Sequence, residues 1–225
     1  MVDGDDTLVD IVEVRDQGLS FFENNKTIIL GIVFGLAALV IGYFVYQTFV
    51  VKPAEQEAMA ALETAQVEFE RDSFNRALVN PNPSELGFVD IVDMYGGTPA
   101  GNLANYYAAV SYLNVGRYEA TLSYMEDFDP NGTMLEAMKY GIIGDAQSEL
   151  DNFDAAITNY QKAMDAAGDN FITGGYYLNK LALLYRNQGN TAEALDAFKR
   201  LKRDYGQSPE AGMADKYIEM LEASK

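Results

Sequence analysis

The sequence predicts an all-α protein in which a single transmembrane helix precedes a solenoid of helix-turn-helix units. Two observations predict this fold. Residues 27–51 carry no charge, and a helix of that length, roughly 37 Å, exceeds the ~30 Å hydrocarbon core of a membrane. After residue 98, three stretches of sequence align on one period, which indicates helix pairs that bury their apolar faces by stacking on their neighbours.

The composition favours a binding protein over an enzyme. The 225 residues carry a formal net charge of −18, so a nucleic-acid partner is not expected, because phosphate binding needs a basic surface. The chain has no cysteine and no histidine, which removes the usual zinc ligands, the usual thiol nucleophile and the usual general base. Asp127, Asp129 and Asn131 resemble the start of a calcium loop, but the residues that follow supply no later ligands. We therefore expect no catalytic residues, no metal and no cofactor.

The segment 1–26 is predicted to be an acidic amphipathic helix on the cytoplasmic side. Its apolar residues recur at helical spacing between acidic ones: Leu8, Ile11, Val12, Leu19 and Phe22. A helix that lies on lipid is normally basic. This acidic one either docks on a basic protein surface or is a frayed lead-in to the membrane helix.

The segment 27–51 is predicted to be an uncleaved anchor, because its apolar run is too long and begins too late for a signal peptide. Arg15 and Lys26 precede it and Lys52 follows it, a bias of one basic residue that places the N-terminus in the cytoplasm. Small residues share one helix face and either form a packing face for a second helix or reflect the background composition of membrane helices: Gly31, Gly35, Ala38 and Gly42.

The segment 52–97 is predicted to be a helical linker pair. One helix should run from 54 to about 78 and a second from 84 to 95, separated by a turn at 80–83 that contains two prolines. Gly96 and Gly97 should end the second helix.

The segment 98–225 is predicted to contain three repeats and a C-terminal capping helix at 209–223. The turn within each repeat falls at Gly116, Asp151 and Gly189. Caps are expected at Thr98, Thr133, Asn190 and Ser208, whereas Gly168–Asn170 and Thr173–Gly175 are expected to be loops. Small and large residues recur at matching positions: Ala109, Gly144 and Ala182, then Thr121, Ala156 and Ala194, then Met125, Tyr160 and Phe198. This pattern resembles the tetratricopeptide repeat.

The order of these parts resembles a known family, most specifically in the segment from Tyr95 to Tyr106 with its GGTPAGNLAN turn. It resembles the YfgM-type ancillary subunits of the SecYEG translocon, which are membrane-anchored tetratricopeptide proteins of the bacterial inner membrane. The resemblance implies a periplasmic repeat domain next to the translocon, with emerging secreted chains or periplasmic chaperones as partners. The alternative is an envelope scaffold for cell division or outer-membrane assembly that is not associated with export.

The first helices of successive repeats are expected to form a concave groove lined by tyrosine and aliphatic side chains, with no basic clamp. Such a surface suits an extended apolar peptide. The alternative is that a helix of the same chain, at 54–78, fills the groove. The outward positions on the middle repeat are Met138, Asp145 and Glu149, and those predicted to bind a partner are Leu103, Tyr106, Val110, Leu113, Tyr176, Asn179, Leu183 and Arg186.

Overall fold

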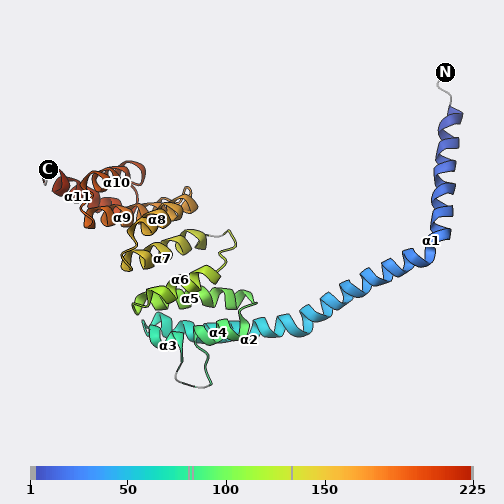
Figure 1. Ribbon diagram of the computed structural model, residues 1–225, viewed down its shortest axis with the longest axis horizontal. Coiled ribbons are helices and arrows are strands. Elements are labelled where there is room, and N and C mark those ends of the chain that lie inside the picture. The colour runs from blue at the N-terminus through green and yellow to red at the C-terminus, as the bar shows by residue number, and fades with distance from the viewer. Residues whose placement is uncertain (1–3, 81, 83, 133, 224–225) are drawn as a thin grey trace. The chain divides into compact units, whose positions relative to one another are not determined.

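The computed structural model describes the backbone of residues 4–80, 82, 84–132 and 134–223, and side chains from residue 19 onward within those ranges. The chain divides into two compact units, Met1–Pro53 and Ala54–Lys225. All regular structure in the described ranges is helical (Figure 1). The prediction of an all-α protein is confirmed.

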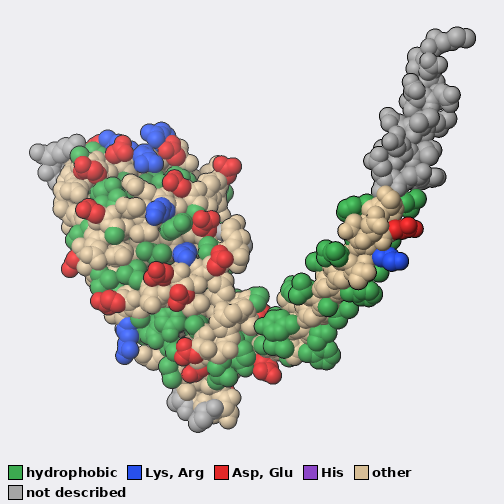
Figure 2. All heavy atoms as spheres, turned by 45° about the vertical axis from the view of Figure 1, so that its right-hand side comes forward, with side chains coloured by type: hydrophobic (Ala, Val, Ile, Leu, Met, Phe, Trp, Pro, Cys, Tyr) green, Lys and Arg blue, Asp and Glu red, His purple; other side chains and the backbone are tan. Residues whose placement is uncertain are grey.

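The first unit is the long helix α1, Gly4–Tyr46, followed by a π-helical turn, η1, Gln47–Val51. The π-helical turn ends two residues before Pro53, which has no N–H to donate and whose ring would clash with the carbonyl four residues earlier in a regular α-helix. Many apolar side chains of this helix are exposed from Leu19 onward, and they lie along the coloured part of the helix in Figure 2. None of its most apolar stretch is buried, and it is long and apolar enough to cross a membrane. An exposed helix of this kind is consistent with a single-pass anchor.

The apolar stripe expected in the segment 1–26 is only partly described. Leu19 and Phe22 are exposed, whereas the side chains of Leu8, Ile11 and Val12 lie outside the described residues. The backbone is helical from Gly4 onward.

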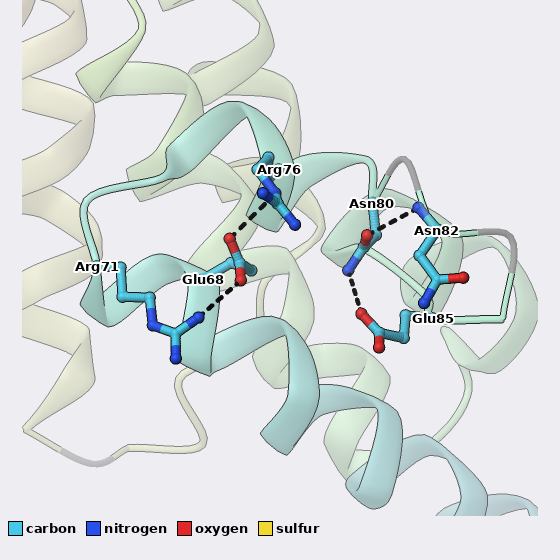
Figure 3. Close-up of polar contacts among 6 residues, drawn as sticks. All are labelled: Glu68, Arg71, Arg76, Asn80, Asn82 and Glu85. Carbon is cyan, nitrogen blue, oxygen red and sulfur yellow. Dashed lines mark hydrogen bonds and ion pairs between the residues drawn. The ribbon is translucent and has the colours of Figure 1, made fainter.

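The second unit begins with α2, Lys52–Glu70, α3, Phe74–Leu78, and α4, Phe88–Tyr95. The prediction of one continuous helix from 54 to 78 is wrong, because Asp72 adopts a left-handed conformation, with φ 56°, between α2 and α3. Figure 3 shows ion pairs at the turn between α2 and α3: the carboxylate of Glu68 pairs with Arg71 and with Arg76, each at 3.2 Å.

The loop between α3 and α4 has its own polar contacts. The Asn80 amide donates to Glu85 at 2.9 Å, and the backbone N–H of Asn82 donates to Asn80 at 3.0 Å (Figure 3). Helices α3 and α4 are separated as expected, but Pro81 and Pro83 of the predicted turn at 80–83 lie outside the described residues. The second helix starts at Phe88 and not at 84.

The remaining helices form sequentially packed pairs that resemble a helical repeat, stacked in chain order in Figure 1. A short 3₁₀ helix, η2, precedes the last helix in place of one continuous helix at 209–223. The elements are α5, Pro99–Asn114; α6, Tyr118–Asp127; α7, Leu135–Glu149; α8, Phe153–Ala167; α9, Phe171–Asn187; α10, Thr191–Asp204; η2, Pro209–Met213; and α11, Ala214–Ala223.

The three predicted turns share one geometry. Gly116, Asp151 and Gly189 have φ of 74°, 59° and 77°. In each turn the N–H of the positive-φ residue donates to the carbonyl three residues earlier, and the next N–H donates to the carbonyl five residues before it. This is the Schellman arrangement that satisfies the last carbonyls of a helix. The predicted register of the repeats is thus confirmed.

The small and large residues predicted to recur in the repeat core are all buried. Thr121, which replaces the alanine of the other repeats, donates its hydroxyl to the Ala109 carbonyl at 3.2 Å, so its polar atom is satisfied. Side-chain caps are present at Thr98 and Ser208 and absent at Asn190. Thr133 lies outside the described residues.

The expectation of a loop at Thr173–Gly175 is wrong, because these residues lie in the first turn of α9. Asn170 caps that helix by accepting the N–H of Thr173 at 3.1 Å. The glycines are tolerated in the helix because later residues occupy the space beside them: a Cβ at Gly174 would lie 2.5 Å from the Tyr205 ring, and one at Gly175 would lie 2.6 Å from Ser208.

Candidate peptide-binding groove

The first helices of the three repeats, α5, α7 and α9, line a cavity of about 420 Å³. The wall is mainly aromatic, aliphatic and methionine side chains, which suits an apolar ligand. It consists of Tyr106, Val110 and Leu113 from α5; Met134 before α7; Met138, Ile142 and Asp145 from α7; Ile172, Thr173, Tyr176 and Tyr177 from α9; and Glu210 from η2.

The mouth of this cavity carries exposed apolar side chains. Met134 is 64% exposed, Ile172 53% and Tyr176 43%. Phe171 and Met213, next to this rim in the sequence, are exposed as well. Clustered exposed apolar residues of this kind mark interaction surfaces in soluble domains.

Glycines in α7 set the depth of the groove. A Cβ at Gly141 would collide with the ring of Tyr177, and one at Gly144 would lie 2.7 Å from the ring of Tyr160. The absence of a side chain at both positions lets the two tyrosines lie against the α7 backbone, where they form the floor between α7 and its neighbours α8 and α9.

A second, polar cavity of about 280 Å³ continues the first, and the two share Leu113 and Asp145. Asp145 accepts the hydroxyl of Tyr160 at 2.7 Å and the ammonium of Lys180 at 2.8 and 2.9 Å. Lys180 also lies 5.1 Å from the centre of the Tyr176 ring, within cation–π range. The groove thus passes from an apolar end to a polar end that contains an ion pair.

Three tyrosines of the groove, Tyr106, Tyr160 and Tyr177, have a raised pKa and stay protonated well above neutral pH. Burial, with a smaller contribution from Tyr107, raises the pKa of Tyr106 to about 12. Burial, and then the charge of Asp145, raises the pKa of both Tyr160 and Tyr177. Their hydroxyls are therefore neutral groups under physiological conditions, and they add polarity to the groove without adding charge.

The structure brings four of the eight predicted groove residues to the apolar cavity: Tyr106, Val110, Leu113 and Tyr176. The other four line neither cavity. Leu103 packs against the core of α2–α5, Leu183 packs against the core of the last repeats, and Arg186 lies 5.0 Å from the ring of Tyr217. Asn179 is half-buried on α9.

Ten residues that line the two cavities were not predicted to take part: Tyr118, Met134, Ile142, Ser148, Tyr160, Ile172, Thr173, Tyr177, Lys180 and Glu210. Met134 precedes α7, Lys180 forms the ion pair, and Glu210 reaches the cavity from η2. The groove was expected to lack a basic clamp; it contains Lys180, whose ammonium is paired with Asp145 at 2.8 Å. Glu210 comes close to the groove because the missing side chains of Gly174 and Gly175 let the segment before η2 lie against α9.

The helix at 54–78 does not fill the groove. Ala58, Leu62 and Ala65 of α2 are buried in a core with α3, α4 and α5, and α2 contributes no residue to either cavity. Glu55 and Glu57 fix that packing through contacts to the Ala100 N–H at 3.4 Å and the Tyr95 hydroxyl at 3.2 Å.

The chain is an all-helical protein with one long apolar N-terminal helix and a body of packed helix pairs. No protein-family model, curated protein or solved structure matches it. Within the described residues, no group of three or more acidic side chains is placed to hold a metal ion.

Proposed function

We propose that this chain is a membrane-anchored binding protein whose repeat domain holds apolar segments of other polypeptides. The observation that carries the proposal is the open groove of α5, α7 and α9, with exposed apolar side chains at its mouth. Tyrosine supplies contact area with few rotatable bonds, and methionine adapts its shape to different partners. Such a wall favours many clients of similar chemistry over one exact fit.

More specifically, the protein is an accessory subunit of the Sec translocon in the bacterial inner membrane. Its N-terminus is cytoplasmic, and its periplasmic repeat domain links emerging secreted chains to chaperones. The support is the resemblance in the segment from Tyr95 to Tyr106, the single exposed apolar helix and the bias of one basic residue before it. Protease added to spheroplasts should remove the repeat domain; a protected domain would reverse this orientation.

Client binding is tested by photo-crosslinking of exported chains to the full-length protein in membranes. Ile172→Ala and Tyr176→Ala together should reduce crosslinking several-fold, because both side chains are exposed at the cavity mouth. They are better targets than Tyr106, whose ring packs 5.5 Å from that of Phe128 and contributes to the core.

The matched control is Met94→Ala with Met220→Ala, which removes two exposed apolar side chains from α4 and α11, outside both cavities. Equal crosslinking by the two double variants would refute the groove as the client site. Melting temperatures of both variants should stay close to that of the wild type, so that a crosslinking loss reports binding.

The translocon assignment has a separate test. Native purification followed by mass spectrometry should recover translocon subunits with the wild-type protein. If division or outer-membrane assembly factors are recovered instead, the protein is an envelope scaffold, and its groove serves that assembly.

A further inference from the structure

The charges that line the groove are unequally matched. The two cavities contain the carboxylates of Asp145, Glu149 and Glu210 and a single ammonium, that of Lys180. Lys180 donates to both carboxylate oxygens of Asp145, at 2.8 and 2.9 Å. Among the described residues, Glu149 accepts the neutral hydroxyl of Tyr118, at 3.0 Å, and pairs with no lysine or arginine. The groove therefore presents uncompensated negative charge at Glu149 and Glu210.

Glu210 is the more informative of the two. Its Oε2 atom is buried and has no hydrogen-bond partner among the described residues, although the side chain faces the apolar cavity. Leaving a buried acceptor without a donor is costly, and the cost rises when the acceptor is charged. The residue as a whole is only half-buried, so a rotation of its side chain brings the carboxylate to the cavity, where a ligand's donor reaches it and recovers that free energy.

We infer that the groove selects apolar polypeptide segments that carry a lysine or arginine next to the apolar stretch, and that Glu210 accepts the cationic group. This inference rests on the proposed function and specifies its client. The apolar side chains enter between Tyr176, Met138 and Ile142, and the cation lies at the edge of the same cavity.

Two physical effects favour a cation over a neutral donor at this position. Hydrogen bonds between ionised partners are about twice as strong as neutral ones. The chain as a whole is acidic, with a net charge of −18, so its field attracts cationic segments and repels acidic ones before contact. The long-range part is screened by salt, whereas the contact with the buried oxygen is screened much less.

The test uses the full chain in nanodiscs of zwitterionic lipid and three fluorescent peptides. The peptides have the same leucine-rich stretch and differ only in one flanking residue, which is lysine, glutamine or glutamate. Wild-type protein should bind the lysine peptide about five- to tenfold more tightly than the glutamine peptide, since a charge-assisted bond exceeds a neutral one by about 1 kcal/mol. The glutamate peptide should bind most weakly. Empty nanodiscs correct for partition into lipid.

Glu210→Gln should reduce the preference for lysine over glutamine to less than about twofold, and the affinity for the glutamine peptide should stay nearly unchanged. Glu126→Gln removes the same charge from an exposed position of α6, outside both cavities, and should leave the preference intact. Retained binding of the glutamine peptide shows that each variant is folded.

The outcomes separate this inference from the proposed function. If the wild type binds all three peptides equally, or if Glu210→Gln keeps the preference, the role of Glu210 is refuted, while the groove remains an apolar site. If the wild type binds none of the peptides, both the inference and the proposed function are refuted.

Discussion

Asp151 is the one turn residue of the three repeats that holds a left-handed conformation with a side chain. Its φ is 59°, where Gly116 and Gly189 occupy the equivalent turns at 74° and 77°. A residue with a Cβ is strained in this region by roughly 1 kcal/mol, and glycine is not.

Asp151→Gly should therefore raise the free energy of unfolding by about 0.5–1 kcal/mol. Gly189→Ala, which introduces the same strain into the next turn, should lower it by a similar amount. Urea denaturation of the full chain in mild detergent measures both. A loss of stability in Asp151→Gly would mean that contacts of the aspartate side chain outweigh the backbone strain.

The buried tyrosines should make the fold sensitive to alkali. The pKa of Tyr106 is about 12 in the folded protein, because burial opposes ionisation, compared with the usual 10.0. Between these values the unfolded chain loses the proton and the folded chain keeps it, so the free energy of unfolding falls as pH rises above about 10. The fall is at most about 1.4 kcal/mol per pH unit for each such group, and less here because Tyr106 is partly solvated.

Tyr106→Phe should make this decline shallower, since phenylalanine has no proton to lose. Urea denaturation at a series of pH values between 9 and 12 compares the slopes. Identical slopes for the variant and the wild type would show that Tyr106 does not remain protonated in the folded state.

At the scale of helices, the repeats were predictable because each turn needs a positive-φ residue and each helix contact needs a small one. Glycine and alanine at those positions are visible in the sequence. The break between α2 and α3 was not visible, because no glycine or proline marks it. It depends on contacts such as the pairing of Glu68 with Arg76 and the packing of the Phe69 ring 5.5 Å from that of Phe74.

The groove was predictable only in part, because contacts that the sequence pattern does not mark place several of its residues. The helical period identified the face that carries Tyr106, Val110 and Tyr176. It could not show that Arg186 lies against Tyr217, since α11 covers that end of the face. The place of Glu210 in the groove could not be predicted from the sequence, because it depends on how closely the segment after α10 approaches Gly174 and Gly175.

The helix contacts within each pair yield a stability prediction. Ala156 and Ala194 are fully buried in α8 and α10, and buried positions in a close-packed core have little space for a larger side chain. Leucine at either position should lower the free energy of unfolding by about 1–3 kcal/mol through overpacking. Glu219→Ala on the exposed side of α11 should change it by less than about 0.5 kcal/mol. Chemical denaturation compares the three variants, and equal effects would contradict the packing register.

At the scale of the whole molecule, the long apolar helix α1 has an uncovered face of small residues. A Cβ added at Gly31, Gly35 or Gly42 would meet no other atom within 4 Å. We expect this face, with Ala38, to pack on a helix of another protein or of a second copy, because small residues at this spacing allow close approach of two backbones.

Gly35→Leu with Gly42→Leu should block that approach and leave insertion unchanged, since leucine is at least as apolar as glycine. Co-purification of partners should then fall. Ala37→Leu, which adds a similar side chain about 100° around the helix from Ala38, should have little effect. If all partners are still recovered with the double variant, the glycines reflect only the composition of the span.

The core between the first and later repeats is small. Its buried members are Ala109, Met125, Phe128 and Ile142, whereas the clusters on either side are much larger. Amide hydrogens of α6 and α7 should therefore exchange with solvent sooner than those of α9 and α10. The groove spans this small core, since its wall includes Tyr106 on α5 and Tyr176 on α9. A client bound in the groove would contact helices on both sides of this small core and hold them together. Amide hydrogens of α6 and α7 would then exchange more slowly, including those that the client does not contact.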